Sequence, residues 1–254
     1  MQRHSEECML SPLTGVCLHA TGYNSCIMMT GSAQYSSSRV ALLNVTDILQ
    51  QIASDVRACT ACKLHQAAMK AVPGEGPPDA RIMFIGEAPG FNEDRQGRPF
   101  VGAAGQFLEE LLGLAGLRRA DVFIANVVKH RPPNNRDPEP DEIAACSEFL
   151  ERQIAAINPP VIVTLGRYSM ARWFPGEKIS RIHGQPRWIG ERMIIPMMHP
   201  AAALHQPQYR TLIEADFRRL PEFVAQAEAR IAQRSAAAAP DKPDEPEVQQ
   251  LSLF

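Results

Sequence analysis

The sequence predicts a three-layer α/β/α fold with a central, mainly parallel sheet of four strands. Two observations carry this prediction. Four short and almost continuously apolar runs recur along the chain, and segments with a helical apolar period separate them. Strands that are apolar on both faces are typical of a parallel sheet covered by helices on both sides. The runs fall within residues 46–230, which are long enough to form one hydrophobic core.

The expected helices have recognisable ends. Thr46 is a plausible N-cap for a first helix that ends near Arg57 and carries apolar residues on one face. A long helix is expected over 141–157, because prolines precede it and Pro159-Pro160 follows it. Shorter apolar-periodic segments predict further helices at 106–114, 168–173 and 209–229.

The four apolar runs are the expected strands, at 81–85, 122–128, 161–165 and 193–197. Ligands of open parallel sheets bind beyond the carboxyl ends of the strands. The segments that follow the four strands are rich in Gly, Pro and polar residues. We therefore expect the functional site to be formed by the loops that start at residues 86, 126, 166 and 198.

Composition excludes several classes of protein. The 254 residues include 26 basic and 28 acidic side chains, so the chain is not a strongly basic nucleic-acid coat, although a few local phosphate contacts remain compatible with it. No apolar run is long enough for a transmembrane helix, and no secretory signal pattern is visible. Six cysteines without such a signal indicate a reducing compartment, where they bind metal or do redox chemistry more often than they form disulfides.

The two ends of the chain differ from the body. Residues 1–45 lack a helical or strand period and are expected to be a disordered extension; the alternative is a second metal site using Cys8, Cys17 and Cys26. Residues 231–254 become rich in Ala, Pro and acidic side chains, which is typical of a flexible tail.

The loop over residues 86–105 has the most informative composition. It contains five glycines, two prolines, three acids and two aromatic residues. The spacing of the glycines does not match a phosphate-binding loop, and three carboxylates would repel a phosphate. A neutral base, bound by backbone amides, suits such a loop better.

Three segments together resemble the family 4 uracil-DNA glycosylases. These are the run from Gly86 to Gly105, the segment Met198 to Leu204, and Asn126 to Lys129 followed by Arg-Pro-Pro. The resemblance covers roughly residues 46–225. It implies an enzyme that flips deoxyuridine out of DNA, hydrolyses the N-glycosidic bond and leaves an abasic site. The inserted histidine loop of a cross-linking relative is absent, so we expect turnover without a covalent DNA intermediate.

The resemblance also implies how uracil is bound. Phe100 would stack on the base, Asn126 would read the N3–H and O4 edge, and Glu93 would crowd the C5 position so that the methyl group of thymine is refused. Each residue has a simpler alternative. Phe100 suits a core ring, Asn126 suits a backbone partner, and Glu93 suits a solvated acid.

Two further residues are expected to act on the bond that breaks. His199 would hydrogen-bond uracil O2 as negative charge develops there, although a histidine at a strand end also suits a simple cap. Glu87 would position the attacking water or stabilise the cationic sugar. Ala88 stands where related enzymes carry an aspartate, so the way in which the water is activated stays open.

DNA contacts are expected around this pocket. Leu204 would enter the duplex as the base leaves, because an apolar side chain can fill the vacated space. Candidate phosphate contacts are Lys129, Arg131, Arg136, Arg167 and Arg210. Solvated surface charge is the alternative for each of them.

A Cys-x-x-Cys pair, Cys59 and Cys62, follows the first helix and alone suits zinc, redox chemistry or half of an iron–sulfur site. The resemblance implies a [4Fe–4S] cluster with Cys59, Cys62 and Cys146 as ligands and with His130 at the remaining position, where the family has cysteine. A three-ligand cluster and a Cys₃His zinc site are the alternatives. The cluster is expected to be structural, tying the first helix to the long helix.

The last five residues resemble the short clamp-binding peptide of bacterial replication and repair proteins. Gln250 would hydrogen-bond, and Leu251, Leu253 and Phe254 would fill apolar pockets of a sliding clamp. The alternative is a frayed apolar end.

We expect a cytoplasmic, nucleoid-associated monomer with no membrane partner. A non-catalytic DNA-binding sensor and an iron–sulfur redox protein with a nucleotide pocket are the competing functions.

Overall fold

The computed structural model describes residues 44–237. The predicted N-terminal extension and the clamp-binding-like peptide, Gln250 to Phe254, lie outside the described residues. No helix of the described part is long and apolar enough to cross a membrane.

A five-stranded sheet forms the centre of the domain. The strands are β1 (Ile82–Gly86), β2 (Phe123–Asn126), β3 (Val161–Leu165), β4 (Arg187–Ile189) and β5 (Arg192–Met197), in the order β2-β1-β3-β5-β4. All neighbouring pairs are parallel except β4 with β5, which is antiparallel. The mainly parallel sheet is therefore confirmed, and the predicted count of four strands was one too low.

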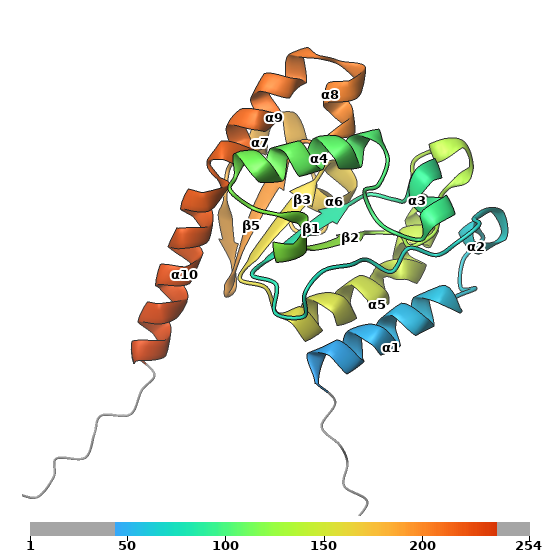
Figure 1. Ribbon diagram of the computed structural model, residues 1–254, viewed down its shortest axis with the longest axis horizontal. Helices are drawn as coiled ribbons and strands as arrows, with labels where there is room; N and C mark the ends of the chain where they lie inside the picture. The colour runs from blue at the N-terminus through green and yellow to red at the C-terminus, as the bar shows by residue number, and fades with distance from the viewer. Residues whose placement is uncertain (1–43, 238–254) are drawn as a thin grey trace, which may run out of the picture. The chain divides into compact units, whose positions relative to one another are not determined.

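The helices form a layer on each side of the sheet (Figure 1). Helices α1 (Val45–Arg57) and α5 (Pro140–Ile157) pack together on one side, and α4 (Ala103–Leu114), α8 (Ala201–His205) and α9 (Gln208–Arg218) pack together on the other. The buried apolar residues accordingly form two clusters, one on each side of the strands. Shorter or peripheral helices complete the fold: α2 (Leu64–Ala67), α3 (Phe91–Gln96), α6 (Arg167–Ala171), α7 (Ile179–Ile182) and α10 (Leu220–Ala237).

Some helix ends differ from the expectation. Asn44, rather than Thr46, caps α1, because its side-chain oxygen accepts the backbone N–H of Asp47 at 3.0 Å. The expected helix over 209–229 is two helices that meet at Arg219. The second of them continues to Ala237, so the expected end of the domain at residue 230 falls inside α10.

The order of the strands fixes where a ligand can bind. From β1 the chain passes to β2 at one edge of the sheet and later returns to β3 on the other side of β1. Loops that leave neighbouring strands in opposite directions open a crevice at their carboxyl ends. Gly86 at the end of β1 pairs with Asn126 at the end of β2, which places these two loop starts next to each other.

Candidate active site

A pocket of about 900 Å³ lies at the carboxyl ends of the strands, within the usual size of small-ligand sites. Its lining includes all six residues that the sequence suggested for catalysis and base binding: Glu87, Ala88, Glu93, Phe100, Asn126 and His199. The residues come from three segments, which lie at the carboxyl ends of β1, β2 and β5. The topological argument from the sequence therefore placed the pocket correctly.

The positions of Asn126 and Phe100, which line the pocket, depend on Gly86. A Cβ at this position would lie 2.4 Å from Asn126 Oδ1 and 2.7 Å from the ring of Phe100. No side chain fits at position 86. Because glycine has none, the amide of Asn126 and the ring of Phe100 can both lie close to its backbone. The rings of Phe100 and His199 stack with their centroids 5.5 Å apart and an interplanar angle of 26°.

Phe100 has a backbone conformation that is uncommon for a residue with a side chain, with φ of 51°. Arg119 holds this conformation in place: its guanidinium donates to the carbonyl of Phe100 at 2.9 Å and to that of Pro99. Glu75 in turn accepts a hydrogen bond from Arg119 Nε at 2.8 Å. No sequence pattern indicated this support, because Arg119 lies in an ordinary polar loop after α4.

Asn126 presents an acceptor to the pocket. The residue is 2% exposed, and its Oδ1 has no hydrogen-bond partner within residues 44–237. A buried acceptor without a partner is costly, and polar ligands commonly supply the missing donor. The pocket is therefore prepared for a ligand that carries an N–H group at this edge.

His199 is held as a neutral donor. The backbone N–H of Ala201 donates to its Nδ1 at 3.1 Å, which leaves the proton of the neutral ring on Nε2. Burial lowers the pKa of His199 to about 4, although the Glu93 carboxylate opposes this shift. At neutral pH the ring is thus uncharged and can donate one hydrogen bond from Nε2. Gly166 makes room for this side chain, since a Cβ there would lie 3.2 Å from that of His199.

Glu87 has an altered acidity. Burial, with a smaller contribution from the Asp137 carboxylate, raises the pKa of Glu87 to about 7, and Arg167 acts in the opposite direction. A carboxyl group with a pKa near 7 can exchange a proton with a reacting group at neutral pH. Asp137, which lines the pocket and pairs with Arg167, was not singled out from the sequence.

Glu93 organises the glycine-rich loop. Its Oε1 accepts the backbone N–H groups of Val101 and Gly102, each at 2.8 Å, and its Oε2 accepts that of Gly90 at 3.1 Å. The carboxylate is therefore fixed in position while it lines the pocket. The alternative of a solvated loop acid does not hold, because Glu93 is buried.

The candidate phosphate contacts have different outcomes. Lys129 is fully buried, and its Nζ donates to Asn126 O at 2.9 Å and to Gln153 Oε1 at 2.8 Å. The expectation that Lys129 contacts phosphate was wrong, because the chain turns inward after β2 and directs the side chain toward α5. Its role is to hold the backbone that carries Asn126.

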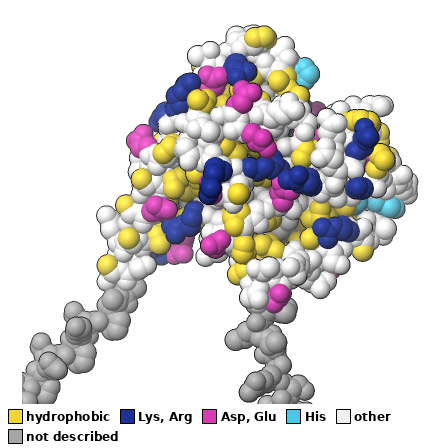
Figure 2. Space-filling view, in the orientation of Figure 1, with side chains coloured by type: hydrophobic (Ala, Val, Ile, Leu, Met, Phe, Trp, Pro, Cys, Tyr) yellow, Lys and Arg dark blue, Asp and Glu magenta, His cyan; other side chains and the backbone are white. Residues whose placement is uncertain are grey.

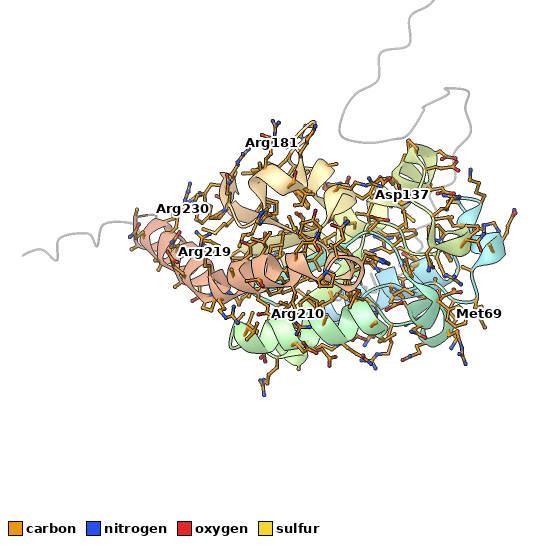
Figure 3. The ribbon with its side chains drawn as sticks, turned by 90° about the horizontal axis from the view of Figure 1, so that it is seen from above. Met69, Asp137, Arg181, Arg210, Arg219 and Arg230 are labelled. Atoms are coloured by element: carbon orange, nitrogen blue, oxygen red, sulfur yellow. The ribbon has the colours of Figure 1, made fainter. Side chains whose placement is uncertain are left out.

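The arginines remain at the surface with existing partners. Arg167 pairs with Asp137, and Arg136 pairs with Glu142 at 2.6 Å. Arg210, labelled in Figure 3, pairs with Glu110 at 2.6 Å, so a phosphate would have to replace a carboxylate there. Leu204 on α8 is 50% exposed near the pocket.

Two of the predicted metal ligands, Cys62 and Cys146, belong to the same apolar cluster on one side of the sheet. Cys146 of α5 is buried, and burial, together with the nearby Cys62 and Cys59, raises the pKa of its thiol to about 11. His130 is buried, its pKa is lowered by burial, and its Nδ1 has no hydrogen-bond partner among the described residues. Thiols and a neutral imidazole with an unused nitrogen are suitable donors for iron or zinc. However, no three His, Cys, Asp or Glu side chains of residues 44–237 are arranged as a ready metal-binding group.

Comparison with known proteins gives consistent matches. The model of the uracil DNA glycosylase superfamily matches residues 73–220. The Type-4 uracil-DNA glycosylase of Sulfurisphaera tokodaii is 52% identical over 187 residues, which are 70% of this chain and 85% of that protein. The Type-4 enzymes of Archaeoglobus fulgidus and Thermotoga maritima are 46% and 45% identical, over 69% and 70% of this chain and 92% and 95% of their own lengths.

Proposed function

This chain belongs to the uracil DNA glycosylase superfamily and is a uracil-DNA glycosylase of DNA repair, and we propose that it releases uracil by a monofunctional hydrolysis carried out in the pocket described above. The family relationship favours this enzyme over a non-catalytic sensor or a redox protein. The observation that supports the assignment of the pocket is the buried, unpartnered Oδ1 of Asn126, since uracil N3–H is a matching donor.

Base binding follows from the geometry. The flipped base would lie against the ring of Phe100 with its N3–H directed at Asn126 Oδ1. Cytosine has an unprotonated N3 at this position and would leave the acceptor of Asn126 unsatisfied. The carboxylate of Glu93, held by three amides, would refuse the methyl group of thymine. A fixed group excludes a larger ligand better than a mobile one, because it cannot move aside.

Bond cleavage would use His199 and Glu87. As the bond between uracil N1 and sugar C1′ breaks, its electron pair passes to the base, and charge accumulates on O2. The Nε2–H of the neutral His199 would donate to that oxygen. Water would form the new bond to C1′, and the carboxylate of Glu87 would take its proton. The base leaves as an anion that takes up a proton from solvent, and Glu87 returns its proton to solvent. The products are uracil and an abasic site.

The cluster is proposed as a structural element. Cys59, Cys62, His130 and Cys146 would hold a [4Fe–4S] cluster, which supplies cross-links between the segment after α1, the loop after β2, and α5. Three thiols and an unpartnered imidazole nitrogen in this region support the proposal. No step of base release depends on it. The three-ligand cluster and the zinc site remain the alternatives, and iron content distinguishes the zinc site from a cluster.

Other parts of the proposal concern DNA and the cell. Leu204, Arg131 and Arg167 would contact DNA beside the pocket. The terminal peptide would bind a sliding clamp, and the protein would act as a monomer on DNA in the cytoplasm, associated with the nucleoid.

The test is release of uracil from an oligonucleotide that contains one deoxyuridine, scored by alkaline cleavage at the abasic site. An otherwise identical oligonucleotide with thymine is the control substrate. We expect cleavage of the uracil strand only, and loss of it in Asn126→Asp, because a carboxylate cannot donate to uracil O4 as the amide Nδ2 would. An Asn126→Asp enzyme with full activity would contradict the assignment of this residue.

A further inference from the structure

Phe91 is a large apolar side chain that lies beside the pocket and has no role in the proposed mechanism. It begins α3 and lines the pocket, yet it is 50% exposed. The guanidinium of Arg131 lies 5.1 Å from the centroid of its ring, and that of Arg95 lies 5.6 Å away. An exposed aromatic ring beside two arginines is an arrangement that suits a nucleic-acid strand, because the exposed part of the ring can stack on a base and the arginines can bind phosphate.

The surroundings of the ring are ordered and basic. Buried Asp94 accepts the backbone N–H groups of Met69 and Lys70 at 2.8 and 3.1 Å, which attaches this segment to α3. Arg95 and Arg131 place positive charge beside Phe91, and the carboxylate of Asp94, 4.0 Å from Arg131, offsets part of it. Figure 2 shows hydrophobic and basic side chains side by side over this part of the surface. Met69, 67% exposed, lies at the edge of the domain in Figure 3.

We propose that Phe91, with Arg95 and Arg131, forms a subsite that stacks on the base adjacent to the flipped uracil in single-stranded DNA and binds the phosphate between the two nucleotides. The inference rests on the proposed pocket for uracil. A nucleotide whose base occupies that pocket has its phosphates at the rim, and Phe91 lies on the rim.

A single strand is favoured over a duplex for a physical reason. In a duplex the neighbouring base stays paired with the opposite strand, and the proposed entry of Leu204 fills the space that uracil leaves. In a single strand the neighbouring base has no pairing partner and can turn onto another surface. The exposed ring of Phe91 can provide that surface. Stacking of one base on an aromatic side chain contributes enough to change affinity about tenfold or more.

The experiment compares single-stranded oligonucleotides that contain one deoxyuridine. The adjacent nucleotide on the 5′ or the 3′ side is either normal or a stable abasic analogue. The enzymes are the full chain, Phe91→Ala, Phe91→Trp and Leu114→Ala. Leu114 is also an exposed apolar residue, but it lies at the end of α4 remote from the pocket, so it controls for the loss of surface hydrophobicity.

We expect Phe91→Ala to lower kcat/KM on the normal single strand about tenfold, and Phe91→Trp to retain it. An abasic neighbour on one side should lower the activity of the unaltered enzyme by a similar factor and leave Phe91→Ala unchanged. On duplex DNA the effect of Phe91→Ala should be less than twofold. Leu114→Ala should behave as the unaltered enzyme on every substrate.

Two outcomes would overturn the inference: an abasic neighbour that affects Phe91→Ala as strongly as the unaltered enzyme, or full activity of Phe91→Ala on the single strand. A substrate with abasic analogues on both sides of deoxyuridine has no adjacent base, so its cleavage reports on the uracil pocket alone. It therefore separates failure of the proposed subsite from failure of the uracil pocket. A lower rate of Phe91→Ala on that substrate would mean that Phe91 acts on the pocket itself, which also overturns the subsite. In addition, Arg95→Gln should reduce the slope of log binding constant against log salt concentration by about one, which corresponds to the loss of one phosphate contact.

Discussion

Replacing Gly86 by alanine should disable the pocket while leaving the fold in place. The added Cβ would stand 2.4 Å from Asn126 Oδ1 and 2.7 Å from the ring of Phe100. These distances are about 1 Å shorter than ordinary van der Waals contact. Both the amide and the ring must therefore shift, and they are the two groups proposed to read and stack the base.

The size of the effect follows from this displacement. A misplacement of about 1 Å in a positioning group costs roughly a factor of 100 in rate. Overpacking at a single site costs about 1–3 kcal/mol of stability, which a domain of this size tolerates. We therefore expect kcat/KM on deoxyuridine to fall about 100-fold in Gly86→Ala, with a cooperative thermal transition retained.

The assay is single-turnover release of uracil, measured together with thermal unfolding. Gly113→Ala is the matched control, because Gly113 lies in α4 and an added Cβ there meets nothing within 4 Å. That substitution should leave activity unchanged and stabilise the helix by about 0.5–1 kcal/mol. Normal activity in a folded Gly86→Ala enzyme would refute the close approach of Asn126 and Phe100 as the basis of base recognition.

Four further outcomes are expected. The rate of uracil release should rise as the pH increases through about 7 and then level off. The reason is that the carboxylate of Glu87 is the active form and its pKa is raised to about 7. The pH–rate profile of Glu87→Gln should lack this rise. His199→Ala should lower kcat about 100-fold, because the Nε2–H donor is lost. In the unaltered enzyme, protonation of His199 should not affect the rate until the pH approaches 4, and single-turnover rates measure both effects. Glu93→Ala should lower the free energy of unfolding, measured in urea, by about 2–4 kcal/mol, because three backbone amides lose their acceptor. The same variant should release mismatched thymine measurably. A stable variant that still refuses thymine would contradict both roles of Glu93. Cys146→Ser should lower bound iron, measured by elemental analysis, and lower Tm, and an unchanged iron content would exclude this residue as a ligand.

The strands of the sheet could be predicted because each buried strand is an apolar run, and β3 was placed with its bounds as the structure has them. Strand β4 was missed because it is a three-residue edge strand with exposed ends, so it shows no apolar run. Helix α3 was missed because it lies inside the glycine-rich loop, where six residues are too few for a helical period.

The site was predictable at the level of loops and less so at the level of side-chain directions. The topological rule brought Asn126 and His199 to one pocket. It could not show that Lys129, three residues after Asn126, points into the core, because a lysine before a polar loop normally lies at the surface. Nor could it reveal Arg119, whose hydrogen bonds to the loop of Phe100 join residues that only the tertiary fold brings together.

The support of Phe100 by Arg119 has a consequence for how base preference can change. The ring position depends on a guanidinium that does not line the pocket and that belongs to the short 3₁₀ turn Arg119–Asp121. A change of length or sequence in that turn would move the ring without altering any residue that faces the base. The position of the ring in this chain therefore depends on a peripheral turn, and a comparison limited to pocket residues would not detect a change made there.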